Sequence, residues 1–117
     1  MFTASQLYNK PNVVKEHEDG YVVFHVEDTV FGYLLHCSVH QWNTTTHKRV
    51  EEVFRHICKR YLDRGVPYFL SVIPADDPKN KKFADMYGFQ YYALLPESNN
   101  EVWVKRLDNA KRPIRKA

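Results

Sequence analysis

The chain has 117 residues, a length that fits one folded domain and leaves no room for a second one of ordinary size. Hydrophobic residues make up 44% of it and aromatic residues 15%, which excludes wholesale disorder. No apolar run approaches the roughly 20 residues that cross a bilayer, and the first residues lack a secretory signal, so we expect no membrane partner. Two cysteines, Cys37 and Cys58, are too few for a disulfide framework and predict a reducing, cytoplasmic setting with both thiols in the core.

The net charge of +3 is unevenly distributed along the chain. Residues 105–117 carry six basic residues against one acid, Asp108, so the end of the chain is strongly basic. A basic tail attracts nucleic acid without reading its sequence, although a solvated terminus is the commoner explanation. Together with the weak patterning before residue 21, this predicts an N-terminal extension (1–20), a folded domain (21–107) and a basic C-terminal tail (108–117).

The folded domain is predicted to begin with two strands, 21–27 and 30–40, joined by a turn at Asp28 and Thr29. The second strand alternates between an apolar face and a face that becomes polar toward its end, with His36, Ser38 and His40. Such a strand is half solvated or faces a cleft.

A helix is predicted over residues 47–64, because apolar side chains recur there at spacings of three and four. The threonines before it supply a cap, and Gly65 with Pro67 ends it. The remaining predicted elements are a buried strand (68–73), a short helix (80–87) that ends at Gly88, and two strands (89–95 and 101–107). This order predicts an α/β (α+β) fold with a mixed, mainly antiparallel sheet, one long crossover helix and one short helix.

From the short helix onward the chain resembles the GCN5-related N-acetyltransferase (GNAT) superfamily. The resemblance lies in the order of elements over about residues 20–107 and in the Gly88-Phe89 pair after the short helix. It implies a truncated GNAT fold in which acetyl-coenzyme A would be held by main-chain groups of one strand and by the start of the long helix. The implied cofactor-binding residues are Cys37, Val39, Asn43, Thr44, Thr45, Thr46, His47 and Lys48.

The sequence departs from the family pattern at the loop that would bind the pyrophosphate. The two glycines of that loop correspond to Thr45 and His47, whose side chains would occupy phosphate space. The basic or glutamine residue that opens it corresponds to Trp42, or to Gln41 in the neighbouring register, and the family's frequent tyrosine acid corresponds to Ala84. We therefore predict a degenerate acyl-coenzyme A site with no bound cofactor.

The chain also resembles small GNAT-like proteins of short-tailed bacteriophages in its length and in its closing hairpin. That resemblance implies a non-catalytic role in protein interaction or virion assembly, with a virion or assembly protein as partner and a location in the host cytoplasm or the virion. Two alternatives stay open at this point. One is an active acetyl-coenzyme A-dependent N-acetyltransferase, and the other is a basic nucleic-acid accessory protein.

If the chain is an enzyme, its candidate catalytic residues are Glu27, His36, Ser38 and His40, because a general base has to titrate near neutral pH and reach its proton. No metal site is predicted. His36 and His40 lie four residues apart on a strand, roughly 13 Å at about 3.3 Å per residue, which is too far for one zinc ion.

Overall fold

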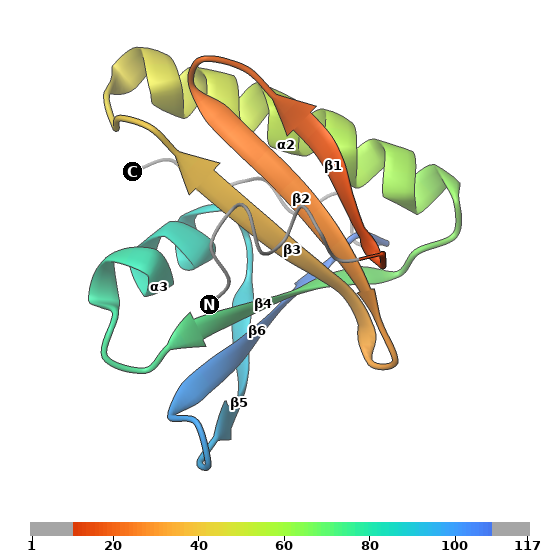
Figure 1. Ribbon diagram of the computed structural model, residues 1–117, viewed down its shortest axis with the longest axis vertical. Helices are drawn as coiled ribbons and strands as arrows, with labels where there is room; N and C mark the ends of the chain where they lie inside the picture. Colours follow the sequence, from red (N-terminus) through yellow and green to blue (C-terminus); the bar gives the residue numbers. More distant parts are fainter. Residues whose placement is uncertain (1–10, 109–117) are drawn as a thin grey trace. The chain divides into compact units, whose positions relative to one another are not determined.

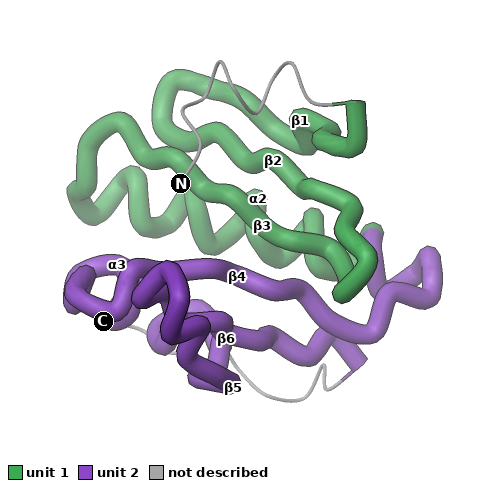
Figure 2. Tube along the Cα trace, turned by 60° about the horizontal axis from the view of Figure 1, so that its bottom comes forward, with its two compact units in different colours: residues 1–60 green, residues 61–117 purple. Residues whose placement is uncertain are grey.

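A computed structural model describes residues 11–108 of the chain. The chain divides into two compact units, residues 1–60 and residues 61–117, which Figure 2 shows in green and purple. The fold class is as predicted: α+β, with six mostly antiparallel strands, one long helix and one short helix (Figure 1). Residues 1–10 of the predicted N-terminal extension and nearly all of the basic tail lie outside the described residues, and the predicted region boundaries stay a prediction.

The first unit is a three-stranded antiparallel sheet with the long helix against one face (Figure 1). Strand β2 lies in the centre and pairs with β1 on one side and with β3 on the other. The last turn of the helix, from Tyr61 onward, belongs to the second unit. The elements are β1 (Val13–Glu18), β2 (Val22–Thr29), β3 (Gly32–Val39) and α2 (Thr44–Asp63).

The core of the first unit forms where alternate residues of β2 meet the apolar stripe of α2. The ring of Phe24 stacks on that of Phe54, with 6.2 Å between their centroids. Since side chains alternate along a strand, Val22 and Val26 lie on the same face as Phe24, and both are buried. Val50 and Ile57 of α2 are also fully buried, which confirms the spacing from which the helix was predicted.

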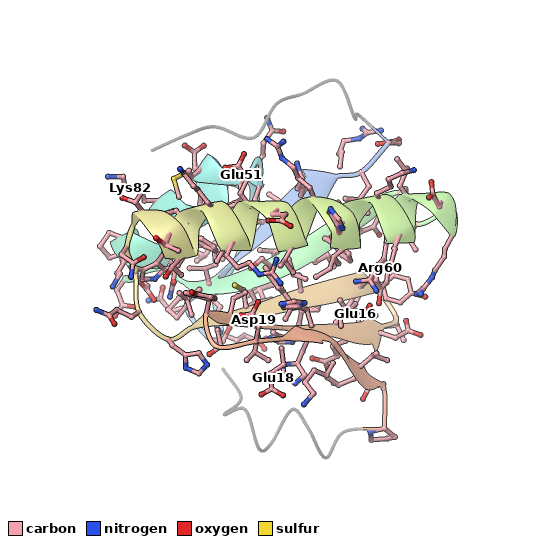
Figure 3. The ribbon with its side chains drawn as sticks, turned by 90° about the horizontal axis from the view of Figure 1, so that it is seen from above. Glu16, Glu18, Asp19, Glu51, Arg60 and Lys82 are labelled. Atoms are coloured by element: carbon pink, nitrogen blue, oxygen red, sulfur yellow. The ribbon has the colours of Figure 1, made fainter. Side chains whose placement is uncertain are left out.

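Two ion pairs tie α2 to the β1 strand and the turn that follows it. Arg60 lies 3.4 Å from Glu16, whose side chain is only 7% exposed (Figure 3). Asp19 accepts hydrogen bonds from Arg49 Nε (2.8 Å) and from the backbone amides of Tyr21 and Val22, and it lies 2.7 Å from His17 Nε2. Burial opposes ionisation of Asp19, but these hydrogen bonds outweigh it and hold the pKa of its carboxyl well below the usual range.

Replacing Asp19 with asparagine is expected to lower the free energy of unfolding at pH 7 by about 1–2 kcal/mol, because hydrogen bonds to a charged group are lost. The folded-state pKa lies below the unfolded value of about 3.9, so the contribution is complete above that value and is lost as the pH falls toward the folded pKa. The difference between wild type and variant should therefore shrink between pH 5 and pH 3, measured by urea unfolding at each pH.

The matched control for that experiment is Glu51→Gln, at a residue labelled in Figure 3. This change removes the i,i+4 ion pair of Glu51 with Arg55 on the same helix. A partly exposed helix pair of this kind contributes about 0.3–0.5 kcal/mol. If Asp19→Asn lowers the free energy of unfolding equally at pH 3 and pH 7, the charge of the carboxylate does not stabilise the turn.

The second unit consists of three antiparallel strands and the short helix. Strand β6 lies in the centre, between β4 and β5. The helix begins at Pro78, and Asp77 caps it by accepting a hydrogen bond from the Asn80 amide. The elements are β4 (Tyr68–Pro74), α3 (Pro78–Met86), β5 (Gln90–Leu95) and β6 (Asn100–Arg106).

The core of the second unit gathers around Phe69, which is fully buried and whose ring centroid lies 5.0 Å from that of Tyr61. After the end of α3 the chain turns at Gly88, whose φ of 90° lies in the left-handed region that favours glycine. Tyr87 and Phe89, on either side of it, are both buried. The Gly-Phe pair of the sequence therefore ends the helix and returns the chain to the core.

Two predictions about the first unit were wrong. Strand β1 was not predicted, because its polar residues show no alternation; a bulge between Lys15 and His17 shifts the pairing, and Glu16 turns to Arg60. The hairpin turn lies at Val30 and Phe31, two residues later than predicted. There the hydroxyl of Thr29 donates to the Gly32 carbonyl and accepts from the Phe31 amide, which closes the turn.

Candidate functional site

The register of the first sheet separates its two faces. Phe24 pairs with Cys37, so both lie on the face that α2 covers, whereas His25 pairs with His36 on the opposite face. Glu27, two residues after His25, shares that opposite face. The sheet therefore carries one apolar face toward the helix and one face that gathers titratable side chains.

Glu27 and His36 form the centre of the polar face. His36 Nε2 lies 3.0 Å from Glu27 Oε1, across the diagonal between neighbouring strands. The side chain of Glu27 is 9% exposed and that of His36 is 17% exposed. The Asn12 amide nitrogen lies 3.5 Å from the second carboxylate oxygen, Oε2. A buried carboxylate thus holds an imidazole that still reaches the surface.

His25 lies beside this pair and is itself buried, with 5% exposure. Its Nε2 atom has no hydrogen-bond partner among the described residues. Burial is the main cause that lowers the pKa of His25, and the proximity of His36 and Lys15 adds to it, so the neutral ring is favoured. A buried polar atom without a partner costs about 1–3 kcal/mol and requires an explanation in a native fold.

Of the four predicted catalytic candidates, the structure brings together Glu27 and His36. Ser38 and His40 lie apart from this pair. Ser38 is exposed and pairs with Val23 in the sheet, and His40 is exposed just beyond the end of β3. The hydrogen bond of His36 goes to Glu27 instead. His25 was not predicted as part of the site; its only signal was a polar residue between two valines of an apolar strand.

The residues implied for cofactor binding on β3 lie on the other face. Cys37 pairs with Phe24 and Val39 pairs with Val22, so both side chains point to the α2 side of the sheet. Burial raises the pKa of the Cys37 thiol to about 12, which keeps it protonated near neutral pH. Cys37 is partly buried rather than a full core residue, and its raised pKa does not favour the reactive thiolate.

The start of α2 is completed by its own side chains. The cap is Asn43 rather than a threonine: its Oδ1 accepts the Thr46 amide at 2.9 Å and the Thr46 hydroxyl at 3.1 Å. Thr46 is consequently buried. Thr44 and Thr45, the two residues before Thr46, are exposed, and the backbone amides of a first helical turn have no partner within the helix.

The aromatic side chains at this helix start contact each other. The rings of Trp42 and His47 have centroids 4.6 Å apart. An anion that arrives here meets the amides and hydroxyls of Thr44 and Thr45, the positive end of the helix and the exposed Lys48. Helix starts of this kind commonly bind a phosphate group.

Among residues 11–108, no group of three or more histidine, cysteine or acidic side chains has the arrangement of a metal site. The same residues include no helix with the length and apolar character that a membrane span requires. Ala84 is buried, and its methyl side chain has no proton to donate.

No protein-family model matches the sequence, and no curated protein matches it. Several solved structures, in contrast, have a similar fold. An aminoglycoside 6'-acetyltransferase type Ii has a TM-score of 0.65 and 16% identity over 93% of this chain and 76% of that one. The ribosomal-protein-S18-alanine N-acetyltransferase of Escherichia coli has a TM-score of 0.56 and 11% identity over 99% and 79%.

The N-acetylglutamate synthase of Neisseria gonorrhoeae, solved with coenzyme A and N-acetyl-glutamate, has a TM-score of 0.57 and 18% identity. It is matched over 92% of this chain but only 28% of its own length. The fold is thus that of the GNAT acetyltransferases, and at these identities the likeness shows the fold alone.

Proposed function

We propose that the chain is an acyl-coenzyme A-dependent N-acyltransferase in which His36, oriented by Glu27, removes the proton from the acceptor amine. The observation that carries the proposal is the buried carboxylate of Glu27 at 3.0 Å from the half-buried imidazole of His36. The fold supports it, because the similar solved structures are named as enzymes that transfer or attach acetyl groups. Among residues 11–108, the buried Nε2 atom of His25 has no hydrogen-bond partner, which supports a functional face as well.

The arrangement assigns each group a task. When Nε2–H of His36 donates a hydrogen bond to the Glu27 carboxylate, Nδ1 is the unprotonated nitrogen of the ring. Its lone pair can then accept a proton. The carboxylate also stabilises the imidazolium that forms when the amine loses its proton. An amine has to be deprotonated before its nitrogen can attack, so this pair supplies the step that the acceptor needs.

The group that the fold implies is an acyl-coenzyme A, whose thioester would supply the activated acyl group. Its pyrophosphate would be held by the Thr44 and Thr45 amides with Lys48, at the exposed start of α2. Cys37 and Val39 would contribute only main-chain groups, since their side chains are directed to the helix side of the sheet.

Acetyl-coenzyme A is expected to stabilise the chain against unfolding by about 2.7 kcal/mol at a hundredfold excess over its dissociation constant. Thr45→Glu should abolish this stabilisation, because a carboxylate beside the exposed amides repels a phosphate while it favours the helix itself. The measurement is the melting temperature with and without cofactor, and the matched control Thr45→Gln should still respond. No shift in wild type at about millimolar cofactor contradicts the proposal.

The acceptor is then sought by release of the free coenzyme A thiol with a set of amines. Three classes follow from the similar enzymes: an aminoglycoside, glutamate and a peptide that begins with alanine. Thiol release that depends on the amine, and acylation of that amine by mass spectrometry, together establish the transfer.

A second candidate function is the non-catalytic role in protein interaction or particle assembly that the sequence predicted, and the helix start favours it. Asn43 consumes one of the amides that a phosphate would use, and the Trp42 and His47 rings crowd the same loop. Binding of acetyl-coenzyme A decides between the two, because the non-catalytic role predicts no stabilisation.

A further inference from the structure

Three basic side chains form a row across the polar face of the first sheet. Lys15 of β1 pairs with His25 of β2, and His25 pairs with His36 of β3. Residues that lie directly opposite each other share one face of a sheet, with their Cβ atoms about 4.5–5.5 Å apart. His25 is the buried member of the row, whereas Lys15 is exposed. A buried histidine therefore lies between two groups that carry or can acquire a positive charge.

The two outer members of this row are each paired with a carboxylate. Lys15 Nζ lies 2.6 Å from Glu18, and His36 Nε2 lies 3.0 Å from Glu27. The Nε2 atom of His25, in contrast, has no hydrogen-bond partner among residues 11–108. Burial, His36 and Lys15 all oppose protonation of His25, and Glu18 favours it with the smallest effect. A proton on His25 would therefore place a buried charge between two like charges, which costs free energy.

Strand β1 is the part of the sheet that such a charge can displace most easily. It is an edge strand that pairs, within residues 11–108, with β2 alone, and a bulge between Lys15 and His17 interrupts the pairing. Strand β3 instead pairs with β2 over eight residues without a shift. The half of β1 after the bulge is also tied to α2, because Glu16 lies 3.4 Å from Arg60. The half before the bulge is the more weakly held one.

We propose that the N-terminal half of β1, residues 13–15, is an acid-sensitive flap that detaches from β2 when His25 is protonated. Detachment moves the Lys15 charge away from His25 and lets water reach the ring, which removes both main costs of the proton. Asn12, at the start of the flap, lies 3.5 Å from Glu27 Oε2. The flap therefore covers the Glu27 carboxylate while it is attached and uncovers it on release.

The pH range of the release follows from the two states of His25. In the detached state the ring reaches water and has the ordinary pKa of about 6.5, whereas burial in the sheet lowers that pKa. The attached flap is therefore fully favoured above about pH 6.5 and loses this advantage as the pH falls toward the lowered value. One proton separates the two states, so their equilibrium changes by at most about tenfold per pH unit.

The flap is tested by hydrogen exchange of the full chain between pH 7 and pH 5, corrected for the intrinsic exchange rate at each pH. The amide of Asp28 donates to the Asn12 carbonyl at 2.9 Å, so its protection reports on the flap. We expect this protection to fall at least about fivefold at pH 5. The amide of His40 donates to the Tyr21 carbonyl, near the opposite end of β2, and should keep its protection.

Three variants identify the group that responds to pH. His25→Phe introduces a ring of similar size that takes no proton, so the protection of Asp28 should no longer depend on pH. Lys15→Gln removes a neighbouring positive charge and raises the pKa of His25 in the attached state, so the loss at pH 5 should be smaller. The matched control His56→Gln removes an exposed histidine of α2 in the same unit and should keep the wild-type pH dependence.

Constant protection of Asp28 in wild type from pH 7 to pH 5 overturns the proposal. So does a loss in His25→Phe as large as that in wild type, because another group would then respond to the acid. An equal loss at His40 and Asp28 means that the whole sheet opens, and it contradicts a flap that moves alone.

Discussion

Replacing His36 with glutamine is expected to lower kcat/KM for acyl transfer by about 10²–10⁴-fold, the contribution of a positioned general base. Glutamine keeps a donor for the Glu27 carboxylate, so the buried acid keeps its hydrogen bond while the proton-accepting nitrogen is lost. The rate is measured as release of the coenzyme A thiol with the best amine acceptor. Stabilisation by acetyl-coenzyme A should be unchanged, which separates the proton transfer from cofactor binding.

Two further variants show whether the pair acts as a unit. Glu27→Gln leaves the imidazole but removes the charge that stabilises its protonated form. We therefore expect kcat/KM to fall, by a smaller factor than for His36→Gln. Ser38→Ala is the matched control, because Ser38 is an exposed residue of the same strand and face and lies outside the pair. Equal rates for wild type and His36→Gln would assign the pair a structural role only.

Replacing Phe54 with alanine is expected to cost about 3–5 kcal/mol of the free energy of unfolding, the usual loss for a buried phenylalanine. Phe54 is 2% exposed, and its ring stacks on Phe24 at the centre of the contact between α2 and the sheet. The loss is a large part of the about 5–15 kcal/mol that stabilises a domain. For a chain of this size it lowers the melting temperature by about 15 °C, which calorimetry or thermal circular dichroism measures.

The control for this experiment is Val30→Ala, at the exposed hairpin turn of the same unit. Substitutions at such positions change the stability by less than about 0.5 kcal/mol. A Phe54→Ala variant that melts within a few degrees of wild type would contradict the assignment of the α2 stripe to the core.

The sequence predicted the long helix well, because its apolar residues recur with the period of a helix, and it predicted the 68–73 strand from a nearly continuous apolar run. Phe54 and Ile57 lie on one stripe of α2, and both are buried. Strand β1 escaped prediction since its stability comes from pairing and from the Glu16 contact to Arg60, neither of which leaves a period in the sequence.

The site could be predicted only in part, because it depends on the register of a hairpin. A turn at residues 28 and 29 would place His36 opposite Tyr21, whereas the actual turn at Val30 and Phe31 places it opposite His25 and diagonal to Glu27. The residue types at Glu27 and His36 indicated a possible general base, but a two-residue shift of the turn decides which candidate side chains lie side by side. The place of His25 beside this pair follows from the same register and had no clear signal of its own in the sequence.

The cap formed by Asn43 has a consequence for how quickly and how firmly any phosphate can be held. Because the first turn of α2 is already ordered by its own side chain, a ligand does not have to organise a flexible loop and gives up little conformational entropy there. The cap also limits the affinity for a phosphate, because the Thr46 amide is already bonded to Asn43 and fewer backbone amides remain for the ligand. Such an anchor suits a ligand that is exchanged rapidly, as a turnover cycle demands, better than one that is retained.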